Sequence, residues 1–265
     1  MFDRAKYEKH LRSRLLGRAL TAVDEVDSTN RAVSAAAGAG AVEGTVIVAE
    51  RQSGGRGRFG RSWASPKGGL WFSLLLRPDL NLVTLPAISI LSGVVLIRTV
   101  GARHALPLHL GWPNDVVYDG RKLAGILVEG KVGESVAVVV GIGVNVNNDP
   151  DDLPAEFAGK ATSLGKITGE KYDLEILLAE IINEYDIGYA ELNEVGLEEI
   201  YTEWKAGLEM IGRAVTLSVD GKKHSGIVKD FTIDGGMILV CESGDELKVP
   251  LDRGTLISPK YIKTL

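Results

Sequence analysis

Residues 114–129 read Asn-Asp-Val-Val-Tyr-Asp-Gly-Arg-Lys-Leu-Ala-Gly-Ile-Leu-Val-Glu, two apolar runs joined by Asp-Gly. Asp-Gly is a favoured dipeptide for a two-residue hairpin, because both central positions of that turn need a positive φ. The segment therefore predicts a strand over 114–118, a tight turn at 119–120 and a returning strand over 123–129. A second turn at Gly133-Glu134 then leads into a long Val-rich strand over 135–147.

Helices and strands are both expected on either side of this β-rich stretch. Before it, apolar periodicity and capping residues predict helices at 3–16, 31–37 and about 84–101, and strands at 21–23, 44–50 and 70–76. A polar, Gly-rich loop occupies 51–69. After the β-rich stretch, a loop-like region at 149–169 precedes two helices at about 173–193 and 196–205.

The sequence pattern changes after Trp204. Residues 212–265 contain four or five short β-type runs separated by Asp-Gly and Ser-Gly pairs. Closely spaced turn signals of this kind are typical of a small barrel. We therefore expect two domains, 1–210 and 211–265.

Composition narrows the class of protein. The chain has 265 residues, of which 45% are hydrophobic and 25% charged, as in an ordinary globular protein. A net charge of −5 argues against a general nucleic-acid binder, which usually carries a basic surplus. Cys241 is the only cysteine, so an intrachain disulfide is excluded and a reducing, cytoplasmic location is the default expectation. No export signal is recognisable, and the most apolar run, 85–100, is too interrupted to span a bilayer.

The loop at 51–63, Arg-Gln-Ser-Gly-Gly-Arg-Gly-Arg-Phe-Gly-Arg-Ser-Trp, concentrates positive charge in an acidic protein. Between residues 51 and 67 there are five cations and no acid. Glycines let a backbone approach a ligand closely, and arginines bind carboxylate and phosphate through paired hydrogen bonds. Gly55 to Gly60 also matches the dinucleotide fingerprint, but that motif must open a helix, and Pro66, Gly68 and Gly69 prevent one. A solvated, mobile basic loop is the other alternative.

Polar residues near the hairpin are a further candidate site. Lys122 beside a tight turn could be an ordinary solvated residue, and Asn114 and Asp115 could be turn formers. Strand periodicity places Asn145 and Asn147 on one face of the Val-rich strand, where they could form a hydrogen-bonding wall.

Taken together and in this order, five segments resemble those of the biotin–protein ligases, also called holocarboxylase synthetases. The segments are Asp-Ser-Thr-Asn at 27–30, the loop at 52–63, Trp-Pro-Asn-Asp-Val at 112–116, Arg-Lys-Leu-Ala-Gly-Ile-Leu-Val-Glu at 121–129, and Gly-Ile-Gly-Val-Asn-Val-Asn at 141–147. The resemblance is close over residues 20–150 and extends in outline to the C-terminal barrel.

The resemblance implies an α+β fold. Its catalytic domain is a mixed β-sheet flanked by helices, like that of class II aminoacyl-tRNA synthetases, followed by a small SH3-like barrel. It implies a ligase that joins biotin and ATP into biotinyl-AMP and then transfers biotin to a lysine of a biotin carboxyl carrier protein. Only about twenty residues precede the first predicted strand, so we expect no winged-helix DNA-binding domain and no DNA partner. We also expect no membrane segment, and the oligomeric state, including a homodimer, is left open.

The resemblance also implies roles for individual residues. Lys122, Arg56 and Arg58 are the expected catalytic cations, which meet the biotin carboxylate and the α-phosphate. Biotin is expected to contact those three residues and Ser28, Thr29, Asn30, Gln52, Gly57 and Gly125. The nucleotide is expected to contact Arg58, Arg61, Trp63, Asn114, Lys122, Asn145 and Ala161. In this set Trp63 is the adenine platform, although its apolar bulk also allows a place in the core. Asp115 or Asn114 is the expected ligand of Mg²⁺.

One position departs from the family's pattern. The family usually has a lysine immediately before Trp-Pro-Asn-Asp, where this chain has Gly111. His109, Arg61 or Lys67 could supply the missing charge, or Gly111 could meet a local backbone requirement. Two other functions stay open: a lipoate–protein ligase, which shares the fold and reaction type, and a non-catalytic sensor of biotin or biotinyl-AMP.

Overall fold

The computed structural model describes residues 2–79, 84–102, 104–131, 136–153 and 159–258. The predicted turn at Gly133-Glu134 lies outside these ranges. The larger sheet has seven strands in the order β1-β2-β3-β7-β6-β5-β4. β1 and β2 are parallel and all the other pairs are antiparallel, so the sheet is mixed. Its strands are β1 (Leu20–Val26), β2 (Val46–Gln52), β3 (Leu70–Leu76), β4 (His109–Gly111), β5 (Asp115–Tyr118), β6 (Arg121–Lys131) and β7 (Ala137–Val144).

The predicted hairpin is confirmed. β5 pairs with β6 through a turn in which Asp119 and Gly120 both have positive φ, 47° and 69°. This is the backbone that the Asp-Gly pair predicts. The Val-rich strand is shorter than expected, because β7 ends at Val144 rather than at Asn147.

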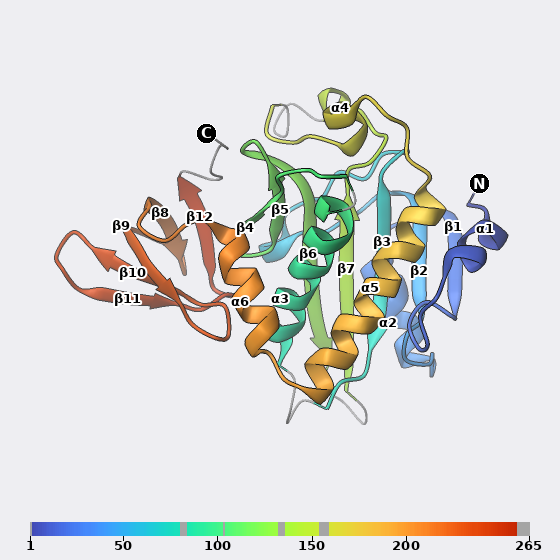
Figure 1. Cartoon of the computed structure of the whole chain (residues 1–265), viewed down its shortest axis with the longest axis horizontal. Coiled ribbons are helices and arrows are strands. Elements are labelled where there is room, and N and C mark those ends of the chain that lie inside the picture. Colours follow the sequence, from blue (N-terminus) through green and yellow to red (C-terminus); the bar gives the residue numbers. More distant parts are fainter. Residues whose placement is uncertain (1, 80–83, 103, 132–135, 154–158, 259–265) are drawn as a thin grey trace.

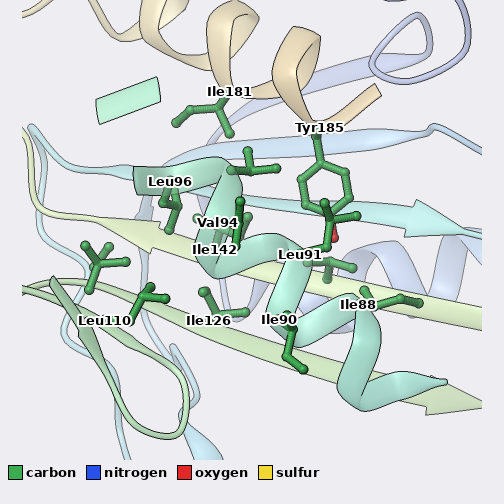
Figure 2. Packing of buried hydrophobic residues seen from close by; sticks show 14 of the residues in the cluster. Ile88, Ile90, Leu91, Val94, Leu96, Leu110, Ile126, Ile142, Ile181 and Tyr185 are labelled. Carbon is green, nitrogen blue, oxygen red and sulfur yellow. The ribbon is translucent and has the colours of Figure 1, made fainter. Parts of the chain in front are cut away.

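Helices cover both faces of the larger sheet (Figure 1). α3 (Leu85–Leu96), which continues as a π-helical turn over Ile97–Gly101, lies on one face beneath α5 (Leu174–Glu194) and α6 (Glu198–Leu208). Figure 2 shows Leu91 and Val94 of α3 packed between the sheet and Tyr185 of α5. α2 (Thr29–Gly38) lies on the opposite face, over a smaller apolar cluster that includes Val33.

Two expectations about local structure were wrong. The first helix, α1 (Arg4–His10), ends well before residue 16. The following backbone amides donate to side chains of α5 instead of to helix carbonyls: Ser13 to Asn183 Oδ1 at 2.9 Å, and Leu16 to Asp186 Oδ1 at 3.0 Å. The region at 149–169, expected to be a loop, contains a 3₁₀ turn at Pro150–Asp152 and a short helix, α4 (Leu164–Thr168), which Ser163 caps.

The C-terminal strands form a second, fully antiparallel sheet in the order β11-β10-β9-β8-β12. Its strands are β8 (Ala214–Val219), β9 (Lys222–Phe231), β10 (Met237–Cys241), β11 (Glu246–Val249) and β12 (Gly254–Ser258). It joins the larger part through Trp112, whose Nε1 donates to the Gly235 carbonyl at 2.9 Å, and through Trp204, which meets Phe231 edge-on. The expected α+β class with a small C-terminal β unit is thus confirmed. In the described part of the chain, no helix combines the length and apolarity needed to cross a membrane.

Candidate active site

A pocket of about 400 Å³ lies on the α2 face of the larger sheet. It brings together every residue that the sequence singled out as a ligand contact: Ser28, Thr29, Asn30, Gln52, Arg56, Gly57, Arg58, Arg61, Trp63, Asn114, Asp115, Lys122, Gly125, Asn145 and Ala161. These residues come from six separate stretches of chain: 28–30, 52–63, 114–115, 122–125, 145 and 161. The pocket also includes Ser62, Lys160, and Thr255 and Leu256 of β12, which sequence reasoning did not assign.

The floor of the pocket is made of glycines from two neighbouring strands. Gly125 of β6 lies opposite Gly143 of β7, and Leu127 lies opposite Gly141. Residues that alternate along a strand share one face, so these four positions form one patch. A side chain at Gly141 would put its Cβ 2.0 Å from Asn30 Oδ1, and one at Gly143 would put it 2.5 Å from Trp63 Nε1. Glycine is therefore required here for the neighbouring groups to lie against the sheet.

The start of α2 provides a polar end to the pocket. The backbone N–H and the hydroxyl of Thr29 both lie within hydrogen-bond distance of Gln52 Oε1, at 2.8 and 3.1 Å. Gln52 Nε2 in turn donates to Ser65 Oγ at 2.7 Å. Ser73 of β3, buried beneath them, lies 2.8 Å from Thr29 Oγ1 and 2.6 Å from Asn30 Oδ1. This end holds uncharged donors and acceptors, which suit a neutral polar group.

Asn30 extends this polar network toward residues 53–63, the loop that follows β2, hereafter the Gly-Arg loop. Its Nδ2 donates to Glu129 Oε2 at 2.7 Å. The other oxygen of Glu129 lies 3.6 Å from Arg56 Nη1. Glu129 belongs to a segment that the sequence singled out, but nothing in the local pattern indicated which residues its carboxylate meets. Ser73, a lone polar residue in an otherwise apolar strand, was the detectable signal that sequence reasoning missed.

The Gly-Arg loop forms a compact flap over the pocket, and it does not open a helix. The Gly57 N–H donates to the Arg61 carbonyl at 2.7 Å, and the only helical element inside the fingerprint is a three-residue 3₁₀ turn over Arg58–Gly60. The dinucleotide alternative is therefore wrong. Arg58 Nη2 donates to the Leu251 carbonyl at 2.7 Å, which links the loop to the C-terminal sheet. Burial lowers the pKa of Arg58 to about 10, so the guanidinium stays positive at neutral pH.

Trp63 lies inside the pocket, on its glycine floor. Its indole covers Gly125 and Gly143 and meets Trp71 edge-on at 6.2 Å between ring centroids. Lys122 Nζ lies 4.7 Å from the ring centroid. The indole N–H is buried and has no hydrogen-bond partner among the described residues.

Lys122 turns into the pocket. Its Nζ lies 2.5 Å from Asp115 Oδ1, and the two side chains are only 23% and 10% exposed. Two backbone hydrogen bonds hold Lys122 in place: its N–H donates to the Lys160 carbonyl, and its carbonyl accepts from the Thr162 N–H. This pairing also places Ala161 against the pocket.

The pair of asparagines after β7 is only partly as expected. Asn145 lines the pocket, where its Oδ1 accepts from Asn148 Nδ2 at 3.0 Å. Asn147 bonds instead to the backbone N–H and carbonyl of Tyr172, both at 2.8 Å. Because the strand ends at Val144, the period-two argument does not extend to residue 147, and Asn147 anchors a loop rather than lining the site.

Gly111 lies in β4 directly opposite Asp115 of β5. Two of the three cations considered as substitutes for the family's lysine have acidic partners elsewhere. His109 Nδ1 lies 3.4 Å from Glu209 Oε1, and Lys67 Nζ lies 2.8 Å from Glu50 Oε2. Arg61 lines the pocket, and so does Lys160.

Comparisons with known proteins agree with this geometry. Residues 23–147 match the model of the biotin/lipoate A/B protein ligase family. The chain is 36% identical over 244 residues to the bifunctional ligase/repressor BirA of Bacillus spizizenii, covering 90% of this chain and 74% of BirA. It is 30% identical over 247 residues to the biotin–[acetyl-CoA-carboxylase] ligase of Mycobacterium tuberculosis, covering 88% of this chain and 89% of that one.

Solved structures agree as well. The biotin protein ligase of Aquifex aeolicus, in complex with biotin and ATP, superposes with a TM-score of 0.80 at 29% identity, over 91% of this chain and 99% of the other. The family match over residues 23–147 includes most of the residues that line the pocket. The chain therefore belongs to the biotin–protein ligases of the biotin/lipoate A/B protein ligase family.

Proposed function

We propose that this chain is a ligase that forms biotinyl-5′-AMP from biotin and ATP and then transfers biotin to a lysine of a biotin carboxyl carrier protein. The observation that carries the proposal is the composition of the pocket. Its lining combines the neutral hydrogen-bonding groups around Gln52 with the cations Arg56, Arg58, Arg61 and Lys122. Biotin likewise combines a neutral cyclic urea with a carboxylate.

In the first step a carboxylate oxygen of biotin attacks the α-phosphorus of ATP, and pyrophosphate leaves. Two anions must approach each other, so the barrier falls where fixed cations offset the repulsion as charge builds at phosphorus. Arg56, Arg58 and Lys122 are the groups that we assign to this task. Gly57, which has no side chain, lets the loop backbone close over the reacting groups.

We assign the remaining contacts to residues that line the pocket. Ser28, Thr29, Asn30 and Gln52 are assigned to the urea of biotin, and Gly125 to the space under its ring and chain. Arg61, Asn114, Asn145 and Ala161 are assigned to the nucleotide, with Trp63 as the surface on which adenine stacks. Because the indole covers the glycine floor, Trp63 must leave that floor when biotin enters.

Asp115 and Asn114 are the groups that would hold Mg²⁺ with ATP. No group of three or more potential metal ligands occurs among the described residues. Mg²⁺ with a nucleotide commonly needs only one or two protein oxygens beside the phosphates. Asn114 Nδ2 donates to the Ile126 carbonyl at 2.5 Å, so the amide oxygen faces away from that bond, and Asp115 adds a carboxylate in the pocket. A bound Mg²⁺ would neutralise phosphate charge.

In the second step the amine of the carrier lysine attacks the acyl carbon of biotinyl-AMP, AMP leaves, and the nitrogen loses a proton. Lys122 is assigned to stabilise the developing charge on the leaving phosphate. We also propose a division into a catalytic domain, 1–210, and an SH3-like domain, 211–265, which the separate sheets support. A reducing, cytoplasmic location fits the single free cysteine, Cys241.

Pyrophosphate release on adding biotin and ATP tests the proposal. Release that depends on both substrates is expected, whereas a non-catalytic sensor would bind biotin without releasing pyrophosphate. Lipoate in place of biotin is the matched control. Faster release with lipoate than with biotin would assign the chain to the lipoate branch instead.

A further inference from the structure

Glu129 lies just behind the polar end of the pocket and has no place in the roles assigned above. It shares the pocket face of β6 with Gly125 and Leu127. Its two carboxylate oxygens meet different partners, because Oε2 accepts from Asn30 Nδ2 at 2.7 Å and Oε1 lies 3.6 Å from Arg56 Nη1. Glu129 therefore contacts one residue of each kind, the neutral Asn30 and the cation Arg56.

Asn30 Nδ2 has two acceptors, Glu129 Oε2 at 2.7 Å and the Leu127 carbonyl at 3.4 Å, and the shorter bond to Glu129 contributes most to fixing which way the Asn30 amide points. An ionised carboxylate only accepts hydrogen bonds, so the NH₂ side of the amide must face Glu129. The oxygen side then faces Ser73, whose Oγ lies 2.6 Å from Asn30 Oδ1. With Glu129 replaced by a group that cannot accept, the two orientations of the amide become closer in energy.

The fixed orientation leaves an acceptor for a ligand. A carbonyl-type oxygen has two lone pairs, and Ser73 occupies one of those on Asn30 Oδ1. Asn30 is 95% buried and lines the pocket, and its Oδ1 lies against the glycine floor at Gly141. A cyclic urea carries two N–H donors, one of which can meet this oxygen. The dithiolane ring of lipoate has no such donor.

We propose that Glu129 is a positioning residue that makes the pocket specific for a cyclic urea, because it holds Asn30 Oδ1 as an acceptor for a urea N–H. This inference rests on the proposed function, since it assumes that biotin occupies the pocket. The looser contact with Arg56 is secondary, because both side chains are more than a third exposed and solvent screens such pairs.

Calorimetric titration with biotin in the absence of ATP tests the inference in three variants. Glu129→Leu removes the acceptor and should weaken biotin binding about 5- to 100-fold, the range for one hydrogen bond lost to a buried partner. Glu129→Gln keeps an acceptor oxygen without the charge and should restore at least half of that loss on a logarithmic scale. Glu25→Leu is the matched control, because Glu25 of β1 is half-exposed, pairs with Arg51 of the neighbouring strand β2 at 2.6 Å and lies outside the pocket lining.

A double-mutant cycle with Asn30→Ala shows whether Glu129 acts through Asn30. In that background Glu129→Leu should change biotin affinity by less than twofold. Lipoate affinity should stay the same in every variant, so the preference for biotin over lipoate falls in Glu129→Leu. Melting curves on each variant identify any that fail to fold.

Three results would overturn the inference: Glu129→Gln as impaired as Glu129→Leu, an undiminished effect of Glu129→Leu in the Asn30→Ala background, or equal losses for biotin and lipoate. Failure of the proposed function is a separate outcome. In that case the wild-type protein itself would bind no biotin and release no pyrophosphate.

Discussion

Replacing Lys122 by Met should damage both stability and catalysis, and the two effects can be separated. Lys122 Nζ pairs with Asp115 Oδ1 at 2.5 Å, and the Asp115 side chain is only 10% exposed. Breaking a fully buried ion pair costs about 3–5 kcal/mol, because the remaining charge stays desolvated. Lys122 retains 23% exposure, so we expect a loss of about 2–3 kcal/mol in the free energy of unfolding. Losing one charge contact to the reacting phosphate should cost about 3–4 kcal/mol more in the barrier, a 10²- to 10³-fold slower adenylation.

The double variant Lys122→Met/Asp115→Asn distinguishes the two effects. It removes the stranded carboxylate and should regain about 2 kcal/mol of stability relative to Lys122→Met. Because Asp115 is also assigned to Mg²⁺, adenylation is compared only between Lys122→Met and the wild type. Urea unfolding measures the first quantity, and pre-steady-state pyrophosphate release at saturating biotin and ATP measures the second. If folded Lys122→Met releases pyrophosphate within threefold of the wild-type rate, Lys122 is only a structural partner of Asp115 and the catalytic assignment fails.

Three further predictions concern the Gly-Arg loop and Gly111 of β4. Residues 51–67 should become resistant to limited proteolysis when biotinyl-AMP is added, because an anion relieves the repulsion among the loop's cations; cleavage at an unchanged rate would contradict this. Trp63→Ala should weaken ATP binding by about 1–3 kcal/mol and biotin binding by less, as measured by calorimetric titration. A melting curve is the control: a large fall in melting temperature with unchanged ATP affinity would identify Trp63 as a packing residue. Gly111→Lys should raise the rate of adenylation up to about tenfold. Residues directly opposite each other in an antiparallel pair share a face, so the new ammonium would lie beside Asp115. An equal or slower rate in a folded variant would exclude the idea that the chain lacks a useful charge at position 111.

The sequence predicted the parts of the fold that local chemistry controls. The Asp-Gly pair specified the turn between β5 and β6, because few residues other than glycine, Asn and Asp adopt a positive φ readily. The mainly apolar run of β3 and the apolar helix α3 were recognisable because each has the length and composition of a buried element. The end of α1 was not recognisable, since residues on α5, far along the chain, decide where its following amides find acceptors.

The same division holds for the site. The residue types and motifs of the Gly-Arg loop and the Lys-Leu-Ala-Gly-Ile segment were enough to predict which residues line the pocket, because reactive residues occur in short, recognisable patterns. Their partners were not identifiable. Some of these contacts join segments that lie far apart in the sequence: Glu129 meets Asn30 and Arg56, and Arg58 meets the Leu251 carbonyl. The contact of Lys122 with Asp115 joins two strands of one hairpin and depends on which face their side chains occupy. Only the packing of the sheet, the loop and the C-terminal strands sets these distances, because hydrogen bonds and ion pairs depend on positions in space that no local pattern encodes.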